Sequence, residues 1–502
     1  MKKILMIILD GFGYREEEHG NAIEMANMEF FKSLWEKYPH SLLEASGEYV
    51  GLPEGQFGNS EVCHEVIGLG KKIKQKITIL NEEVLTKRIL NNEVFQELIS
   101  STKKNKCTLH LMGLVSDGGV HSHINYILKL IPILKEQGIK KVVFHAITDG
   151  RDTYGRCSIK YLRQIEDVLK ENKVGYLGTI CGRYYAMDRD NKWDRTKKYY
   201  DLVVNSKGFK VNNYEIAINN CYKKNITDEF LPPIILDDDS NIKEGDNVLW
   251  LNFRPDRARQ ILSALTNSEF DVFSTKYQVN TWNMFEVAEV DNVHTLFEIP
   301  KEDLYPIGKY FSDLGISQAR IAETEKFSHV TYFFNAEMAK KFPGCDNYLV
   351  DSPKVPTYDE VPLMSAEDVT RKVKSAINKN YDFILVNYAN PDMIGHTGNL
   401  NAAIKALKGL DKLLEYIVNY SIDNFYKVFI LSDHGNCDEM LSANNEIITT
   451  HSMSKVPFII TDENISLKKN GDLTNVAPTL LNYMDIAIPK EMGDSKSLII
   501  EE

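Results

Sequence analysis

Residues 1–13 of the chain read MKKILMIILDGFG, and the apolar run that begins at Ile4 ends at Asp10. Two lysines before an apolar run also occur in secretory signal peptides, but this run is short and stops at a carboxylate. A short apolar run that ends in a turn signal is typical of a strand buried on both faces of a parallel sheet. The stretch therefore predicts a buried strand with an acidic residue at its carboxyl end.

Short apolar runs alternate with amphipathic stretches along the rest of the chain. The helical pattern is clearest between Ala402 and Val418, where leucine and isoleucine recur every three or four residues. Alternation of buried strands with helices is the signature of an α/β protein. We therefore expect the α/β fold class, with a parallel sheet.

Length, net charge and cysteine content limit the classes of protein to which this chain can belong. A chain of 502 residues is too long for one hydrophobic core, so two or more domains are expected. The net charge of −12 argues against nucleic acid or an anionic membrane as a partner, and no apolar stretch is long enough to span a bilayer. Seven scattered cysteines without a C-x-x-C pair indicate no disulfide framework, which favours a reducing cytoplasm.

Potential metal ligands stand where the apolar runs near the two ends of the chain stop. Functional groups in open parallel sheets gather beyond the carboxyl ends of the strands, so these residues can share one edge. Carboxylates and imidazoles suit a pair of divalent ions that clamp the oxygens of a transferred phosphoryl group. A turn or a helix end explains any one of them equally well, but their recurrence favours a metal site. The candidates that follow such runs are Asp10, Asp392, His396, Asp433 and His434, and His451 lies in the segment before the run VPFIIT.

The middle of the chain ends its apolar runs mainly in arginine. Guanidinium groups pair with carboxylate and phosphate through two parallel hydrogen bonds, so these residues predict an anion pocket. A surface ion pair remains the simpler explanation of any single arginine. Asp152, beside Arg151, is placed to move a proton at a substrate hydroxyl. The candidates are His121, Arg151, Asp152, Arg183, Arg189, Arg254 and Arg257.

The separation of these two sets predicts the topology. If Asp10 and Asp433 meet at one site, the chain between about Lys74 and Lys301 leaves the first domain and returns to it as an inserted domain. The crossing points fall in KKIKQK (71–76) and IPKEDLYPIG (299–308), which are charged and proline-containing as linkers often are. The expected domains are residues 1–74 with 302–502, and residues 75–301.

The stretch GLPEGQFGNSEVCHEVIG, residues 51–68, places Ser60 where a helix is expected to begin. Most serines at such positions are N-caps. The alternative is a nucleophile, because a nearby metal and a helix N-terminus would both favour an anionic phosphoryl group there. The local sequence leaves both interpretations open.

Taken together, the motifs resemble those of the cofactor-independent phosphoglycerate mutases, metalloenzymes of the alkaline phosphatase superfamily. The resemblance extends over nearly the whole chain, and the motifs occur in the family's order. They are LDGFGYR, GLPEGQFGNSEV, LMGLVSDGGVHSH, TDGRDT, GRYYAMDRD, NFRPDRAR, AETEKFSHVTYFF, DSPKVPTYD, NYANPDMIGHTG, SDHGNCDEM and VAPTLL.

The resemblance implies a phosphatase-like metal-binding domain built from both termini, and an inserted transferase-like domain that binds the substrate. It implies interconversion of 3-phosphoglycerate and 2-phosphoglycerate through a phosphoserine, without bisphosphoglycerate, by a monomer that uses two manganese or magnesium ions. Manganese suits mixed carboxylate and imidazole ligands better. Because glycerate must be retained away from water, we expect the two domains to close about the linkers near Lys74 and Lys301.

The resemblance also implies roles for individual residues. Ser60 matches the nucleophile, Asp152 the residue that moves the proton, and Lys326 a substrate contact from the phosphatase side. The arginines and the histidine of the middle region match the other substrate contacts. The metal ligands would be Asp392, His396 and His451 for one ion, and Asp10, Ser60, Asp433 and His434 for the other.

One departure and two rival functions follow from the same residues. Cys63 stands where the family has glycine, either as a tolerated small residue or as a reactive thiol near the metals. A phosphatase or phosphopentomutase would need the metal ligands and Ser60 but not the arginine clamp. A catalytically silent, metal-dependent interaction protein would show no turnover in an assay coupled to enolase.

Overall fold

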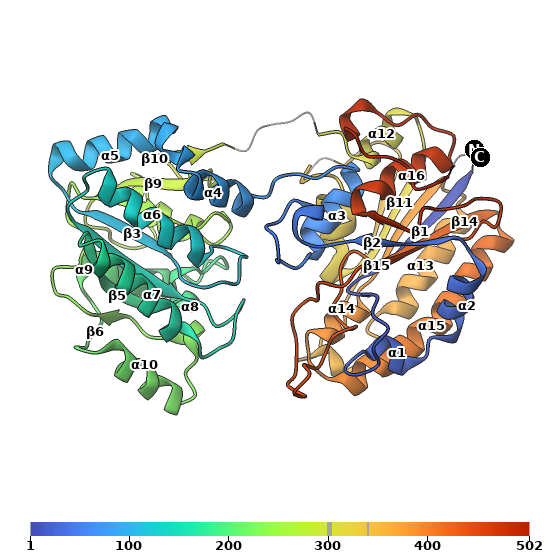
Figure 1. The fold of residues 1–502 in the computed structure, drawn as a ribbon, viewed down its shortest axis with the longest axis horizontal. Coiled ribbons are helices and arrows are strands. Elements are labelled where there is room, and N and C mark those ends of the chain that lie inside the picture. The colour runs from blue at the N-terminus through green and yellow to red at the C-terminus, as the bar shows by residue number, and fades with distance from the viewer. Residues whose placement is uncertain (1, 299–303, 339–340, 501–502) are drawn as a thin grey trace. The chain divides into compact units, whose positions relative to one another are not determined.

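The computed structural model describes residues 2–298, 304–338 and 341–500. The chain forms two compact units, one from Met1–Lys74 with Lys301–Glu502 and the other from Gln75–Pro300. Each unit has its own eight-stranded sheet with helices packed on it (Figure 1). The α/β class is therefore confirmed. The linker expected near Lys301 lies outside the described residues.

The first unit is built on a sheet with the order β12-β11-β13-β1-β14-β15-β2-β16. Its central strands β13 (Phe383–Tyr388), β1 (Lys3–Leu9) and β14 (Tyr426–Leu431) run parallel. β1 is buried over nearly its whole length, which explains its uninterrupted apolar sequence. The other strands are β11 (Gln318–Glu323), β12 (Cys345–Val350), β15 (Val456–Ile460), β2 (His40–Glu44) and β16 (Asn470–Asp472).

The register of this sheet brings the ends of its central strands to one level. Ile8 of β1 pairs with Asn387 on one side and with Leu431 on the other. β15 runs antiparallel to β14, so residues that precede β15 lie beside the carboxyl end of β14. This reversal departs from the parallel arrangement expected from the sequence. It explains how a residue before a strand reaches the same edge as residues that follow strands.

Helices cover both faces of the first sheet (Figure 1). The helix predicted over 402–418 is confirmed as part of α15 (Leu400–Asp423), whose apolar stripe packs into the core with β14 and α13. α3 (Ser60–Leu69) lies on the other face with α12 and α16. The remaining bounds are α1 (Ala22–Ala26), α2 (Glu29–Lys37), α12 (Ile307–Asp313), α13 (Ala366–Asn378), α14 (Asn390–Gly395) and α16 (Val476–Tyr483).

The second unit repeats this layered plan with the strand order β10-β9-β8-β3-β4-β5-β7-β6. The parallel strands β3 (Leu109–Leu114), β4 (Val142–Thr148) and β5 (Gly175–Gly182) are neighbours, and β8 (Asn247–Trp250) extends them beyond β3. The other strands are β6 (Phe209–Lys210), β7 (Ile234–Ile235), β9 (Asn280–Phe285) and β10 (Val293–Phe297). The helices are α4 (Lys76–Leu85), α5 (Glu93–Asn105), α6 (Ile124–Glu136), α7 (Ser158–Glu171), α8 (Arg183–Ala186), α9 (Trp193–Asn205), α10 (Tyr214–Lys223) and α11 (Arg259–Thr266).

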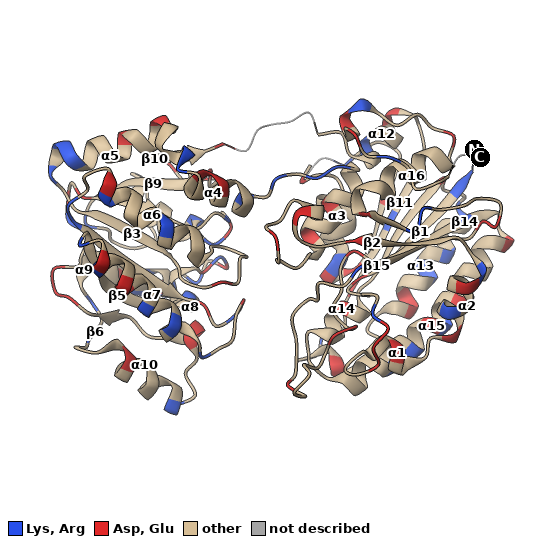
Figure 2. Ribbon diagram, viewed as in Figure 1, with Lys and Arg blue, Asp and Glu red and all other residues tan. Residues whose placement is uncertain are grey.

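The helices of the described residues include none that is both long and apolar enough to cross a membrane. Basic and acidic residues are interspersed along the helices α2 and α15 (Figure 2). The excess negative charge is therefore not collected on these helices as one acidic surface.

Candidate functional site

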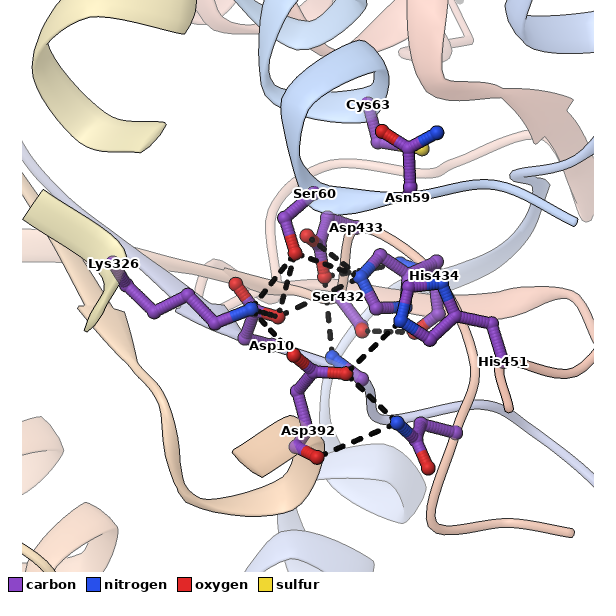
Figure 3. A network of polar contacts seen from close by, with 12 residues as sticks. Asp10, Asn59, Ser60, Cys63, Lys326, Asp392, Ser432, Asp433, His434 and His451 are labelled. Atoms are coloured by element: carbon purple, nitrogen blue, oxygen red, sulfur yellow. Dashed lines mark hydrogen bonds and ion pairs between the residues drawn. The ribbon is translucent and has the colours of Figure 1, made fainter. Parts of the chain in front are cut away.

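Three buried carboxylates meet at the carboxyl edge of the first sheet. Asp10 follows β1, Asp433 follows β14, and Asp392 lies in α14 directly after β13. Asp10 and Asp433 are 0% exposed and Asp392 is 3% exposed. Figure 3 shows these side chains directed toward one another, with His434, His451 and Lys326 around them. Burial of three carboxylates at one point requires compensating positive charge.

The first group consists of Asp392, His396 and His451. The Nε2 atoms of the two histidines are 3.1 Å apart, and Asp392 Oδ1 lies 3.2 Å from one and 3.3 Å from the other. Each ring has its Nδ1 on a backbone carbonyl, Thr449 O at 2.7 Å and Gly58 O at 2.8 Å. A carbonyl only accepts, so both Nδ1 atoms carry hydrogen and both Nε2 lone pairs face the carboxylate. Three electron-pair donors that converge in this way fit a cation.

The second group consists of Asp10, Asp433 and His434, with Ser60 beside it. His434 Nε2 is 2.9 Å from Ser60 Oγ and 3.4 Å from Asp433 Oδ2. The Ser60 hydroxyl also lies 3.1 Å from Asp10 Oδ1. Within the described chain Asp433 Oδ2 is buried and accepts no hydrogen bond of good geometry, although His64 Nδ1 and His434 Nε2 lie 3.3 and 3.4 Å away, and such an oxygen suits a cation. In each group the candidate ligand atoms lie within 4.8 Å of one another.

Lys326 joins the two groups. Its Nζ lies 2.6 Å from Asp10 Oδ1, 2.5 Å from Asp392 Oδ2 and 2.8 Å from Ser60 Oγ. Burial alone would lower the pKa of this ammonium, but the surrounding carboxylates outweigh burial and raise the pKa. One ammonium leaves the three carboxylates under-neutralised, so the residues present fit two divalent cations.

Ser60 is the first residue of α3, and the N-cap is Asn59. The Asn59 side chain accepts a hydrogen bond from Val62 N at 3.0 Å, as an N-cap does. The interpretation of Ser60 as the cap is therefore wrong. Its hydroxyl is therefore available to contact the carboxylates, the imidazole and Lys326. It lies at the N-terminus of the helix, where the helix dipole favours anions.

Two further residues near Ser60, His64 and Asn387, were not singled out from the sequence. His64 Nδ1 lies 2.8 Å from Ser60 O and 3.3 Å from Asp433 Oδ2. Asn387 Nδ2 donates to Asp10 Oδ2 at 2.7 Å and lies 3.1 Å from His64 Nε2. The spacing of four residues between Ser60 and His64 on one helix was a readable signal for the first. Asn387, inside the apolar run of β13, was a readable signal for the second.

Cys63 lies on the same helix, beside Asn59 in Figure 3. Its side chain is buried, and its Sγ is 3.7 Å from Ala45 O. Burial raises the pKa of this thiol well above its usual range. A buried, protonated thiol disfavours the interpretation of Cys63 as a reactive group.

The arginine candidates cluster in the second unit. Burial lowers the pKa of Arg257 to about 10, with further contributions from the charges of Arg189, Arg183 and Arg151. Burial also lowers the pKa of His121, together with the charge of Arg183. Guanidinium groups close enough to lower one another's basicity form an electropositive cluster, which suits an anion.

Acidic residues hold these arginines in place. Asp256 accepts from Arg189 Nη1 at 2.7 Å and from Arg254 Nε at 3.1 Å, and His121 Nδ1 lies 3.8 Å from it. Arg257 Nη1 donates to the carbonyl of Met187 at 3.0 Å. The sequence motifs contained these acids beside the arginines but gave no way to tell a holding residue from a substrate contact.

Arg183 is the most buried of the set, with 3% exposure. Its Nη1 donates to Asp149 Oδ1 at 2.7 Å and also contacts Asp152 Oδ2. Arg151 is half-exposed, with its Nη1 3.6 Å from a Glu229 carboxylate oxygen. Burial raises the pKa of Asp152, and the nearby charge of Asp149 adds to that rise. A carboxyl whose pKa moves toward neutrality exchanges protons more readily.

Comparisons with known proteins bear on both units. The family model described as "BPG-independent PGAM N-terminus" matches residues 80–290, and the one described as "Type I phosphodiesterase / nucleotide pyrophosphatase" matches residues 308–484. A Prochlorococcus marinus protein named 2,3-bisphosphoglycerate-independent phosphoglycerate mutase is 44% identical, over 99% of this chain and 94% of its own. A Staphylococcus epidermidis protein of the same name is 42% identical over 98% of both chains.

A solved structure is similar over the full length. It is a crystal structure of Leishmania mexicana phosphoglycerate mutase at low cobalt concentration, with 27% sequence identity and a TM-score of 0.81. The similarity covers 100% of this chain and 98% of the other. Both the sequence and the fold are therefore similar along nearly the whole chain.

Proposed function

The chain belongs to the 2,3-bisphosphoglycerate-independent phosphoglycerate mutases, and from that premise we propose how its two clusters divide the interconversion of 3-phosphoglycerate and 2-phosphoglycerate. The discontinuous unit is the metal-binding domain that transfers the phosphoryl group. The inserted unit is the domain that holds glycerate. The placement of Ser60 carries this proposal, because its hydroxyl faces Asp10, His434 and Lys326 at the start of a helix.

Two divalent cations would occupy the groups around His451 and His434, where they would supply Lewis-acid stabilisation of charge on the phosphoryl oxygens. The mixed carboxylate and imidazole donors favour manganese over magnesium. The orphaned oxygen of Asp433 and the facing imidazole lone pairs support this assignment.

Ser60 acts as the nucleophile. It reacts as the alkoxide, its proton having been lost to solvent before the cycle begins, and Lys326 Nζ, 2.8 Å from its Oγ, stabilises the negative charge on this oxygen. The alkoxide Oγ forms a bond to the phosphorus of 3-phosphoglycerate, and the bond from phosphorus to the 3-oxygen breaks with its electron pair left on the 3-oxygen. The alkoxide is restored when the phosphoryl group is transferred to the 2-oxygen. The N–H groups at the start of α3 face the same region, which favours the phosphoryl group on Ser60.

Asp152 moves the proton between the two hydroxyls of glycerate. It takes the proton of the 2-hydroxyl and returns it to the 3-oxygen, so its protonation state is the same before and after. The 2-oxygen then attacks the phosphoserine, and Ser60 leaves as the group is transferred. The surrounding guanidinium groups of Arg183 and Arg257 hold the glycerate carboxylate during the exchange.

Retention of glycerate requires the exclusion of water. We propose that the two domains close on the substrate about the chain near Lys74 and the second linker, in a monomer. Solution scattering with and without substrate and manganese tests closure, and an unchanged radius of gyration in every state would contradict it. The cysteines found among the described residues are all unpaired, which supports a reducing cytoplasm as the setting.

The test of the mechanism uses metal-stripped protein with single ions restored, assayed through enolase without added bisphosphoglycerate. Acid-quenched enzyme is expected to carry phosphate on Ser60, and Ser60→Ala to lose roughly 1,000-fold or more in kcat. Ser421→Ala is the matched control, because Ser421 is buried in the same unit and its hydroxyl, within the described chain, donates to Ile417 O of its own helix. Substantial turnover by Ser60→Ala would defeat the mechanism, and release of free phosphate in place of isomerisation would indicate a phosphatase.

A further inference from the structure

We propose that Asp149 is a positioning residue. It fixes the geometry of three proposed substrate contacts, Arg183, Arg151 and Asp152, here called the glycerate clamp, by hydrogen bonds to the side chain of the first and the backbone of the other two. This inference rests on the function proposed above, since these three residues are substrate contacts only in that reaction.

The contacts of Asp149 define this role. Its Oδ1 accepts from Arg183 Nη1 at 2.7 Å, from Arg151 N at 3.2 Å and from Asp152 N at 3.0 Å. Its Oδ2 accepts from Ser116 Oγ at 2.6 Å. One carboxylate therefore binds the side chain of one proposed substrate contact and the backbone of two others.

The position of Asp149 in the sheet explains why one residue reaches all of these groups. It follows β4, the middle strand of the parallel trio β3, β4 and β5. Ser116 lies just beyond β3, and Arg183 begins α8 just beyond β5. The side chain is 1% exposed, so its charge is withdrawn from water and its hydrogen bonds are strong.

The tight turn that follows Asp149 requires glycine at position 150. Gly150 has φ +72°, in the left-handed region that glycine adopts without strain. A Cβ at this position would lie 2.7 Å from Glu229 N, so the chain here is closely packed as well as tightly turned. The backbone of Arg151 and Asp152 therefore leaves the sheet along a path that the Asp149 carboxylate then fixes.

The pairing with Asp149 orients Arg183 for an anion. Among the described residues both hydrogen bonds of its guanidinium use Nη1, which leaves Nε and Nη2 for a ligand. A guanidinium already held on one edge loses less conformational entropy when it binds a carboxylate on the other. Asp149 also contributes to the raised pKa of Asp152, after burial and against the opposing charges of Arg183 and Arg151.

Other buried aspartates of the unit show what a purely structural role looks like. Asp246 accepts from Thr108 N at 2.9 Å and Lys243 N at 2.9 Å, and lies 3.2 Å from His110 Nε2. It precedes β8, at the opposite end of the sheet from the arginine cluster, and it contacts none of the proposed substrate residues in the described chain. Asp246→Asn is therefore a matched control for Asp149→Asn, since both remove a buried charge.

The test compares kcat, KM and thermal stability of the two variants in manganese-loaded enzyme. Asp149→Asn is expected to lower kcat/KM about 100-fold, with a raised KM, because the clamp is misplaced by a fraction of an ångström to an ångström. Asp246→Asn is expected to lose stability but keep kcat and KM within about twofold. A loss of folded protein alone would reduce kcat and leave KM unchanged, so an unchanged KM in Asp149→Asn overturns the inference.

A double-mutant cycle shows whether Asp149 acts through Arg183. The effect of Asp149→Asn is expected to shrink about tenfold or more in an Arg183→Ala background, and full additivity would contradict the inference. If Asp149→Asn fails to fold, Ser116→Ala retains the carboxylate and loses one of its donors. Its KM is expected to rise about threefold, and an unchanged KM would count against the inference. Absence of mutase turnover in the unaltered chain would instead overturn the proposed function itself.

Discussion

Replacement of Lys326 by methionine is the most direct test of how the three buried carboxylates, Asp10, Asp392 and Asp433, are stabilised in the absence of metal. The ammonium is buried and touches Asp10, Asp392 and Ser60 at 2.5 to 2.8 Å. Methionine keeps most of the length and the apolar stem but removes the charge. The three carboxylates then lose a buried counter-charge, and breaking a buried pair in this way costs about 3–5 kcal/mol.

That loss translates into a large change in melting temperature. At roughly 2–4 °C per kcal/mol for a domain of this size, about 4 kcal/mol lowers the transition by roughly 8–16 °C in chelator-treated protein. Manganese should narrow the difference, because cations bound between the carboxylates replace the missing charge and stabilise the folded state. Scanning calorimetry with and without manganese measures both effects.

The control is Lys309→Met, which removes a lysine from the same unit that forms an exposed pair with Asp313 at 2.8 Å. An exposed pair contributes about 0–1 kcal/mol, so this variant should melt within roughly 4 °C of the unaltered chain. Metal-free Lys326→Met that melts as the control does would refute the view that Lys326 compensates the buried carboxylates.

The remaining predictions concern residues outside this cluster. Burial lowers the pKa of both His110 and His145, which lie 2.9 Å apart between β3 and β4. Below about pH 6.5 the unfolded chain therefore binds more protons than the folded chain. The free energy of unfolding should decrease as the pH is lowered, by roughly 1.4 kcal/mol per pH unit for each of the two imidazoles. Urea unfolding at pH 7.5 and 5.5 measures the slope, which should decrease in His145→Gln; an equal slope would contradict the assignment. Peroxide should inactivate the unaltered chain and Cys63→Gly at the same rate, because the Cys63 thiol is buried and protonated. A resistant Cys63→Gly would restore the reactive-thiol interpretation.

The carboxylate cluster was accessible from the sequence because its members follow apolar runs. A short continuous apolar run is typical of a strand covered on both faces, and parallel neighbours place their last residues at one edge. Asp10 and Asp433 follow this rule directly. His451 does not, since it precedes a strand, and only the antiparallel direction of β15 brings it to that edge. Periodicity carries no information about strand direction, so the sequence offered His451 as a candidate without showing how it reaches that edge.

The start of α3 shows where the sequence was misleading. Asn59 and Ser60 are both residue types that cap helices, and their order in the chain does not say which one does. The structure separates them by backbone conformation, because Asn59 is extended at φ −144° while Ser60 is already helical. A shift of one residue changes Ser60 from a helix cap to a residue whose hydroxyl contacts Asp10, His434 and Lys326, which is the difference between the two interpretations.

Residues that hold others in place were the least accessible from the sequence. Asp149 and Asp152 stand three positions apart in TDGRD, and either could contact a substrate. Their difference lies in side-chain direction, since Asp149 also faces Ser116 and the backbone of its own turn, while the side-chain contact of Asp152 in the described chain is with Arg183. Direction depends on packing between strands that are far apart in the chain, and a single sequence does not encode it locally.

The ends of the inserted unit explain why the first sheet tolerates the insertion. Lys76, where α4 begins, lies over the Phe285 ring with Nζ 5.7 Å from its centroid. Phe285 pairs in register with Phe297, close to the end of the unit. The first helix and the last strand of this unit therefore lie close together. A domain whose two ends are close can be inserted at one point of another domain without a large change in that domain.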